Sequence, residues 1–311
     1  MDLKIVKIDH DLCIYREGNM IQTMNKLMEI NSIAYYYGRD IEIDLSKTNK
    51  VTAAASLLLF AIVNRAQLCA RPNQVIKITL PTRKQNPEGY TWIVSTGLAK
   101  ALLANDFDKL DELTKSERYY QSSVNPYLHH AYTAQLLNKK ADFTPEQFLM
   151  LESGISEAML NVWHHAYDSE KFSDLVACLG GKRWWQCAWF NQEKDRVTFI
   201  ICDLGMGIPE SFSNPSMTKE NYMDAAILAS AWSPGQTRTG VAGRGNGSED
   251  IKRPIGAGCT ENESLLIHSG HARYCKSSGE EAPSSIYTKV GVPGTLVQWS
   301  LVPKRGEYDS H

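Results

Sequence analysis

Three polar residues spaced four apart, Glu157, Asn161 and His165, form the first set in this sequence that could do chemistry. In an α-helix a step of four residues turns the side chain by only about 40°, so the three would lie along one stripe. The stripe offers a carboxylate that can orient or deprotonate an attacking group, an amide oxygen for a hard Mg²⁺ ion, and an imidazole. A solvated helix face has the same spacing, so the triplet needs support from elsewhere in the chain.

Two glycine-containing segments follow along the chain. Asp203, Gly205 and Gly207 come directly after an apolar stretch. A carboxylate at the end of a strand can accept a hydrogen bond from the amine of a base, and the glycines let the backbone approach closely. The segment GRGNG (243–247) precedes an expected helix and would present backbone N–H groups to phosphate. Taken singly, each segment is also typical of a turn or a surface loop.

The order of these pieces carries more information than any one of them. The helix triplet is followed by the strand that ends at Asp203, then by the glycine-rich loop, and finally by an expected strand over 293–303 that opens with Gly294 and Thr295. Polar helix face, strand with a terminal carboxylate, phosphate-type loop and final strand are the parts that a nucleotide site needs. The order therefore predicts a nucleotide-binding domain.

In this order the motifs resemble the GHKL superfamily of ATPases, which includes gyrase, a heat-shock chaperone, histidine kinases and mismatch-repair ATPases, over roughly residues 143–305. The segment GISEAMLNVWHHAY (154–167) is most similar to the anti-sigma-factor serine/threonine kinases, whose motif reads close to SEAxxNxxxHAY. Sensor histidine kinases usually have Asn at the position of Glu157 and Lys at that of His164.

The resemblance implies an α/β sandwich, with a mixed sheet and helices on one face, that holds ATP and Mg²⁺. It makes Glu157 the general base or a water-orienting carboxylate, Asn161 the Mg²⁺ ligand and Asp203 the acceptor for adenine. The glycines of 243–247 would cradle the phosphates. The other nucleotide-binding residues that it implies are His164, His165, Gly205, Gly207, Gly243, Arg244, Gly245, Asn246, Gly247, Lys252 and Thr295.

The resemblance also implies a mobile lid over about residues 229–242, from which Arg238, or Arg244 just beyond it, would reach the γ-phosphate. Ser248 and Glu249 stand where relatives usually have apolar residues, and Pro254 limits the helix that should follow. We therefore expect an unusual lid closure or helix geometry.

Strands and helices must position these residues. Thr144 and Pro145 predict the start of the helix that carries the triplet, and we expect this helix to run through residue 167. The first hundred residues alternate between strand-like and helix-like segments, which predicts a smaller α/β domain over 1–104. The expected elements and boundaries are strands at 41–46 and 75–81, helices at 51–70 and 95–104, a connecting segment at 105–142, a β-hairpin from 182–190 and 196–205, the ATP-binding domain at 143–305 and a tail at 306–311.

Residues 43–66 of the N-terminal domain resemble a STAS domain, in which a strand ending in Asp-Leu leads to a helix start with an acceptor serine. Here Ala53 occupies the serine position and Thr52 the preceding Asp position. The resemblance implies a docking or regulatory module that is no longer phosphorylated at that site. The alternative is a domain that merely packs on the ATPase.

Composition excludes several classes of function. With 33 Lys and Arg against 35 Asp and Glu, the chain lacks the cationic field that nonspecific nucleic-acid binding requires. Seven scattered cysteines without a CxxC pair argue against a disulfide framework or a zinc ribbon. No apolar stretch approaches the roughly 20 residues that span a bilayer, so we expect a cytoplasmic protein without membrane contact.

Two functions remain open. The chain is an enzyme that transfers phosphate from ATP to water or to a partner's Ser or Thr, or it is a nucleotide-gated binding switch with little turnover. Glu157 favours the enzyme, whereas the segment 248–250 leaves room for the switch. Both imply ATP and a protein partner, and neither excludes a homo-oligomer. Stand-alone domains of this superfamily also occur in bacterial stress and phage-defence systems, and no residue selects that setting.

Overall fold

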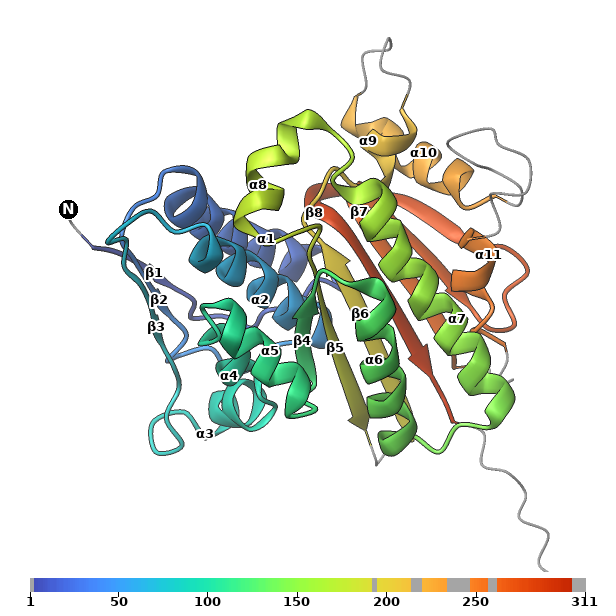
Figure 1. Cartoon of the computed structure of the whole chain (residues 1–311), viewed down its shortest axis with the longest axis horizontal. Helices are drawn as coiled ribbons and strands as arrows, with labels where there is room; N and C mark the ends of the chain where they lie inside the picture. Colours follow the sequence, from blue (N-terminus) through green and yellow to red (C-terminus); the bar gives the residue numbers. More distant parts are fainter. Residues whose placement is uncertain (1–2, 192–194, 214–219, 234–246, 257–261, 304–311) are drawn as a thin grey trace, which may run out of the picture. The chain divides into compact units, whose positions relative to one another are not determined.

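The computed structural model of the protein describes residues 3–191, 195–213, 220–233, 247–256 and 262–303 (Figure 1). It confirms the α/β class, with one parallel and one antiparallel sheet. The chain forms two compact units. The first unit comprises residues 1–124, 169–187 and 202–204, and the second comprises 125–168, 188–201 and 205–311.

The first unit contains a three-stranded parallel sheet in the order β1-β2-β3. Parallel neighbours need crossover connections, and helices provide them here. The elements are β1 (Lys4–Lys7), α1 (Glu17–Asn31), β2 (Ile41–Asp44), α2 (Ala53–Leu68) and β3 (Ile76–Thr79). The strands and helices expected in this part of the chain are therefore confirmed, including the last of them as α4 (Leu98–Leu102).

Helix α2 is apolar on all sides, and every residue from Ala54 to Ala66 is buried. A helix that is apolar all round belongs inside a core, which explains why its periodicity could not indicate an inner face. Two buried polar side chains in α2 have partners. Asn64 Oδ1 accepts a hydrogen bond from Trp185 Nε1 (2.8 Å), and the Ser56 hydroxyl bonds the Tyr120 hydroxyl (2.8 Å). Neither α2 nor any other helix in the described part of the chain is long and apolar enough to cross a membrane.

The segment 105–142, expected to be a connection, is folded. It contains α5 (Phe107–Lys115), β4 (Tyr120–Ser123) and α6 (Pro126–Lys140). Side-chain oxygens cap both helices, because Asp106 accepts from the Lys109 N–H (2.8 Å) and Asn125 from the Leu128 N–H (3.2 Å). The remaining short elements before α7 and after it are α3 (Pro87–Gly89), π-turns at Ser32–Tyr36 and Tyr90–Ser95, a 3₁₀ turn at Glu170–Phe172 and α8 (Ser173–Cys178).

A five-stranded sheet in the order β4-β5-β6-β8-β7 is antiparallel rather than mixed, which corrects that part of the expected fold. Its further strands are β5 (Trp184–Asn191), β6 (Arg196–Asp203), β7 (Ser264–Ser277) and β8 (Ser284–Leu301). The predicted hairpin is confirmed as β5 and β6, which are neighbours in the sheet. The final strand begins at Ser284, well before the expected 293, because it pairs along its length with β7.

The helices of the second unit are α6, α7 (Pro145–Asn161), α9 (Ile208–Phe212), α10 (Asp224–Ala231) and α11 (Gly247–Lys252), with a 3₁₀ turn at Asn221–Met223. Helix α7 packs on β8, where a Cβ at Gly154 would lie 3.5 Å from the Trp299 ring. Trp299 Nε1 donates to the carbonyl of Ile251 in α11 (2.8 Å), and its ring lies 5.9 Å from that of Phe199. One large aromatic side chain thus holds both helices against the sheet.

Candidate functional site

Helix α7 carries most of the predicted polar triplet, and its start is set by the local sequence. The Thr144 hydroxyl oxygen accepts from the Gln147 N–H (3.3 Å), and the Gln147 side chain accepts from the Thr144 N–H (3.2 Å). This reciprocal capping box, with Pro145 at the first helical turn, defines where the helix begins. The predicted N-cap is confirmed, and the helical register of Glu157 and Asn161 follows from it.

Glu157 lies on α7 in a half-buried position. Burial raises the pKa of its carboxyl group above the usual value, and the nearby carboxylate of Asp250 raises it further. A carboxyl group with a raised pKa is a stronger base once it is ionised, and such groups concentrate at functional sites.

The backbone of Gly247 approaches the Glu157 carboxylate so closely that a Cβ there would collide with Oε1. Gly247 is the last glycine of the predicted phosphate loop and the first residue of α11. Only glycine allows this approach without displacing Glu157. Two pieces of the predicted site, far apart in the sequence, are therefore in contact.

The helix changes geometry after Asn161, its last α-helical residue. Val162–Ala166 form a π-turn, so the uninterrupted helix expected to run to residue 167 is wrong. Because a π-turn bonds i to i+5, the rotation per residue after Asn161 is smaller than in an α-helix, so His165 does not take the position that a continuous α-helix would give it. His164 is exposed and His165 is half-buried, and their rings lie 6.0 Å apart. Such turns occur frequently at functional sites.

The end of this π-turn contacts the first glycine segment. The Met206 N–H donates to the Ala166 carbonyl (2.8 Å), and a Cβ at Gly205 would collide with the same carbonyl. The helix that carries Glu157 and the loop that starts at Gly205 are therefore joined backbone to backbone.

A second contact joins this loop to β8 through Ser269 of β7. Ser269 Oγ accepts from the Ile208 N–H (2.8 Å), donates to the Gly294 carbonyl (3.0 Å) and lies 3.0 Å from the Thr295 hydroxyl. Gly207 has a positive φ of 78°, and a Cβ there would lie 2.9 Å from both Ser269 Oγ and the Gly294 carbonyl. The predicted site residues Gly207 and Thr295 are thus brought together.

An irregularity in β8 makes this contact geometrically feasible. Ser269 pairs with Thr295 but Gly270 pairs with Val292, so Pro293 and Gly294 are extra residues on the β8 side. A residue in a bulge leaves the hydrogen-bond ladder, and Pro293 has no backbone N–H that would lose its partner there. Gly294 takes a positive φ of 67°. The bulge turns the Gly294 carbonyl toward Ser269 and Gly207.

Several predicted residues are placed differently or lie outside the described residues. Asp203 ends β6 and is only 4 % exposed; it belongs to the first unit, whereas the chain from Gly205 belongs to the second. The predicted phosphate-binding residues Gly243, Arg244, Gly245 and Asn246, and Arg238 of the predicted lid, lie outside the described residues.

Lys252, expected to neutralise phosphate charge, is held by groups of its own unit. Its ammonium bonds the Trp232 carbonyl and forms an ion pair with Glu249 (2.8 Å), and its side chain is 10 % exposed. Helix α11 ends at this residue, two positions before Pro254, as the sequence predicts. In this arrangement the Lys252 ammonium group stabilises α11, and its charge is already paired with Glu249.

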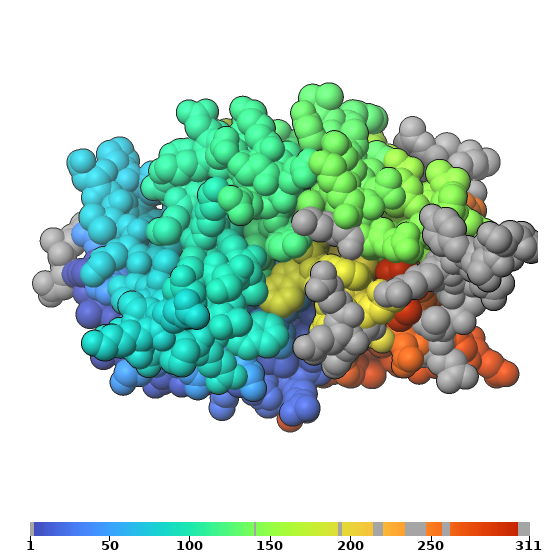
Figure 2. Space-filling view, turned by 90° about the horizontal axis from the view of Figure 1, so that it is seen from below, coloured from blue at the N-terminus to red at the C-terminus, as the bar shows by residue number. Residues whose placement is uncertain are grey.

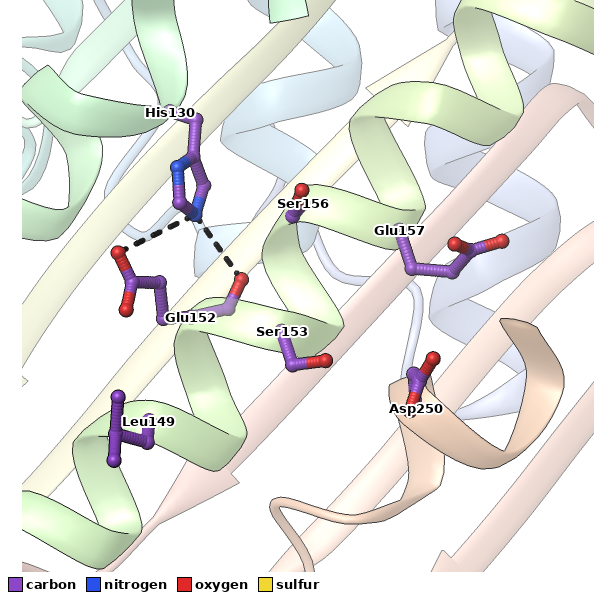
Figure 3. Close-up of a pocket in the computed structure, with 7 residues that line it drawn as sticks. All are labelled: His130, Leu149, Glu152, Ser153, Ser156, Glu157 and Asp250. Atoms are coloured by element: carbon purple, nitrogen blue, oxygen red, sulfur yellow. Dashed lines mark hydrogen bonds and ion pairs between the residues drawn. The ribbon is translucent and has the colours of Figure 1, made fainter. Parts of the chain in front are cut away.

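A cavity of about 320 Å³ borders Glu157 (Figure 3). Three helices line this cavity. Helix α11 contributes Asp250, α6 contributes His130, and α7 contributes Leu149, Glu152, Ser153, Ser156 and Glu157. His130 Nε2 lies 3.2 Å from the Glu152 carbonyl and 3.7 Å from its carboxylate. Figure 2 shows α6 and α7, in green, at the surface of the molecule. The cavity gives a solvent path toward the Glu157 carboxylate.

Two residues of this region were missed by sequence reasoning, Ser269 and Asp224. Asp224 begins α10 and accepts from the His271 N–H (2.7 Å), where Gly270 takes a positive φ of 56°. One feature of the sequence could have pointed to this region, the Ser-Gly pair inside the apolar strand LLIHSGHARY. A glycine within a strand indicates a bulge or a close approach of another backbone segment.

No known protein-family model matches the chain, and no curated protein matches it either. No group of three or more His, Cys, Asp or Glu side chains suited to a metal ion occurs among the described residues. Within the second unit, Gly205 meets the π-turn, Gly207 meets Ser269 and Gly247 meets Glu157.

Proposed function

We propose that the chain binds Mg-ATP through a GHKL-type domain in its second unit and acts as an ATPase or a protein serine/threonine kinase on a partner protein. The observation that carries the proposal is the convergence of four of the predicted segments. The Gly205 loop meets the end of the Glu157 helix, Gly207 meets Thr295 through Ser269, and Gly247 meets Glu157. Glycines in unrelated surface loops would not be expected to contact these other segments.

The residues present fit a magnesium nucleotide. Mg²⁺ usually takes only one or two protein oxygens and draws its other ligands from phosphate and water, so Asn161 is a sufficient protein ligand. Bound Mg²⁺ would supply neutralisation of the charge that develops on the transferred phosphate. Glu157 would take the proton of the attacking hydroxyl or water, which can reach it through the neighbouring cavity.

The test is turnover and binding measured together. Glu157→Ala should lower ATP turnover by at least about a hundredfold, the usual contribution of a general base, while the dissociation constant for Mg-ATP by calorimetry changes little. Thr295→Val should weaken ATP binding, because it removes a hydroxyl of the second unit that the resemblance assigns to the nucleotide. Unchanged turnover in Glu157→Ala would remove that residue from the chemistry. Absence of ATP binding by the unaltered protein would end the proposal as a whole.

A second candidate is a nucleotide-gated switch with slow turnover. Burial and the Asp250 carboxylate both favour the protonated form of Glu157, which cannot act as a base. ATP would then act by favouring one of two conformations. Tight ATP binding without turnover, together with slower amide hydrogen exchange in α10 and α11 when ATP is bound, would support the switch. Equal exchange rates in these helices with and without ATP would count against it.

A further inference from the structure

Two cysteines of the first unit, Cys69 and Cys178, meet although they lie far apart in the sequence. Cys69 directly follows α2, and Cys178 is the last residue of α8. Their thiols are hydrogen-bonded to each other. Burial raises the pKa of the Tyr35 hydroxyl and the charges of both thiols raise it further, so the two sulphurs also lie near one common neighbour. A disulfide joins sulphurs about 2.0 Å apart, and thiols already in contact need only a short movement to form it.

The backbone on each side of the contact is held by the first unit. The Cys69 N–H donates to the Arg65 carbonyl (3.0 Å), which closes the last turn of α2. Just beyond α8, Gly180 takes a positive φ of 69°, and a Cβ there would lie 3.1 Å from the Phe107 ring. The turn that follows Cys178 is therefore packed against a residue of its own unit.

The two thiols differ in access and in acidity. Cys178 is exposed, whereas Cys69 is partly buried. Burial, together with the charge and the hydrogen bond of Cys178, raises the pKa of the Cys69 thiol to about 12. The nucleophile in thiol chemistry is the thiolate, so a reagent from solution meets Cys178 first while Cys69 keeps its proton.

We propose that Cys69 and Cys178 form a reversible disulfide by exchange with a small-molecule disulfide, with Cys178 as the attacking thiol and Cys69 as the resolving thiol. The Cys178 thiolate attacks one sulphur of the reagent, whose S–S bond breaks and releases one thiolate. Cys69 then loses its proton, attacks the Cys178 sulphur of the mixed disulfide and releases the second thiolate. The protein gives up two electrons and two protons, and the reagent is reduced to two thiols.

The first exchange step prepares the second. In the mixed disulfide Cys178 carries neither a charge nor a thiol hydrogen, so two of the causes that raise the pKa of Cys69 are removed. The Arg65 guanidinium, whose charge lowers that pKa, stays in place. Cys69 therefore becomes a thiolate more readily once Cys178 has reacted.

The disulfide would fasten α8 to the end of α2. The chain leaves the first unit after residue 124 and returns to it at residue 169, so α8 lies on the returning segment. A crosslink between residues far apart in the sequence restricts the unfolded chain, which should make the oxidised protein more stable than the reduced one. Both cysteines belong to the first unit, so the inference is independent of the proposed nucleotide binding.

The experiment exposes the reduced full chain to glutathione disulfide and maps its peptides by mass spectrometry without reduction. In the unaltered protein the peptides of Cys69 and Cys178 should be joined, and the melting temperature should rise. Cys69→Ser should stop at a stable mixed disulfide on Cys178, and Cys178→Ser should lose the crosslink and leave Cys69 a thiol. Cys13→Ser is the matched control, since it replaces another partly buried cysteine of the same unit and should leave the crosslink unchanged.

The unaltered protein alone can overturn the proposal, whatever the variants do. A mixed disulfide that accumulates on Cys178 without a crosslink would show that Cys69 does not resolve it. A Cys178 thiol that the reagent leaves unmodified, or a crosslink from Cys69 to a different cysteine, would overturn the pairing itself. Dithiothreitol should restore both thiols and the original melting temperature, and a crosslink that survives this reductant in the folded protein would contradict a reversible disulfide.

Discussion

At the scale of single residues, Glu157 combines two properties that oppose each other. Burial strengthens it as a base, but the same burial and the Asp250 carboxylate keep a larger share of it protonated. An ionised carboxyl group is needed to accept a proton, so turnover should fall as the pH drops through its raised pKa. The acid limb of the pH profile therefore reports directly on the environment of Glu157.

Asp250→Asn removes one of the two causes of the raised pKa. The pKa of Glu157 should fall, and the acid limb of the turnover profile should move to lower pH, with the plateau at high pH nearly unchanged. Turnover measured across the pH range in the unaltered protein and in the variant tests this expectation.

The matched control is Arg253→Gln, because Arg253 Nη1 forms an ion pair with Asp250 Oδ1 (2.7 Å) that Asp250→Asn also breaks. Loss of that partly exposed pair alone should cost only about 0.3–0.5 kcal/mol of stability, and it should not move the acid limb downward. An acid limb that stays in place in Asp250→Asn would mean that burial alone sets the pKa.

Among individual residues, the sequence analysis named three glycines, because glycine-containing segments are visible in the sequence itself. Gly205, Gly207 and Gly247 each sit where a Cβ would meet another group closely. Ser269 was not predicted because its hydrogen-bond partners, Ile208 and Gly294, lie on two other segments of the chain.

At the scale of elements, the start of α7 is encoded locally and should respond to local change. Thr144→Ala removes one side of the capping box and should lower the free energy of unfolding by about 1 kcal/mol. Thr144→Ser retains the hydroxyl and should restore most of the loss. Urea unfolding of the three proteins measures the difference, and equal stability of the Ala variant would show that Pro145 alone is enough to start the helix.

Two elements that the sequence analysis placed differently lie where distant parts of the chain meet. The π-turn that ends α7 contacts Gly205 and Met206 through Ala166, and periodicity carries no trace of these contacts. The expected start of β8 at residue 293 falls on a Pro-Gly pair, and such a pair often interrupts a strand. Here the pair forms a bulge inside the strand instead.

At the scale of the whole molecule, the first unit depends on segments that lie far along the chain. Residues 169–187 and 202–204 belong to it, and Trp185 and Tyr120 satisfy buried polar groups of α2. A fragment of residues 1–104 would lack both partners. Asn64 Oδ1 would lose the hydrogen bond from Trp185, although Asn64 Nδ2 still donates to the Ala104 carbonyl. The Ser56 hydroxyl would lose its bond with Tyr120, although it still donates to the Ala53 carbonyl. Buried polar groups without partners cost about 1–3 kcal/mol each, a large share of the stability of a small domain.

We therefore expect the fragment 1–104 to be unfolded or aggregated, with apolar surface that binds a hydrophobic dye. Circular dichroism and dye fluorescence, compared with the full chain, measure this. A cooperative melt of the isolated fragment would show instead that the βα segments are stable without the later parts of the chain.

The complete burial of α2 limits how the first unit could recognise another protein. From Ala54 to Ala66 no side chain reaches solvent, so this helix has no face to present to a partner without leaving the core. Regulation by binding would have to use other parts of the unit. Tyr36 and Tyr37, which follow α1, are 64 % and 62 % exposed and are the first positions at which to look for such a contact.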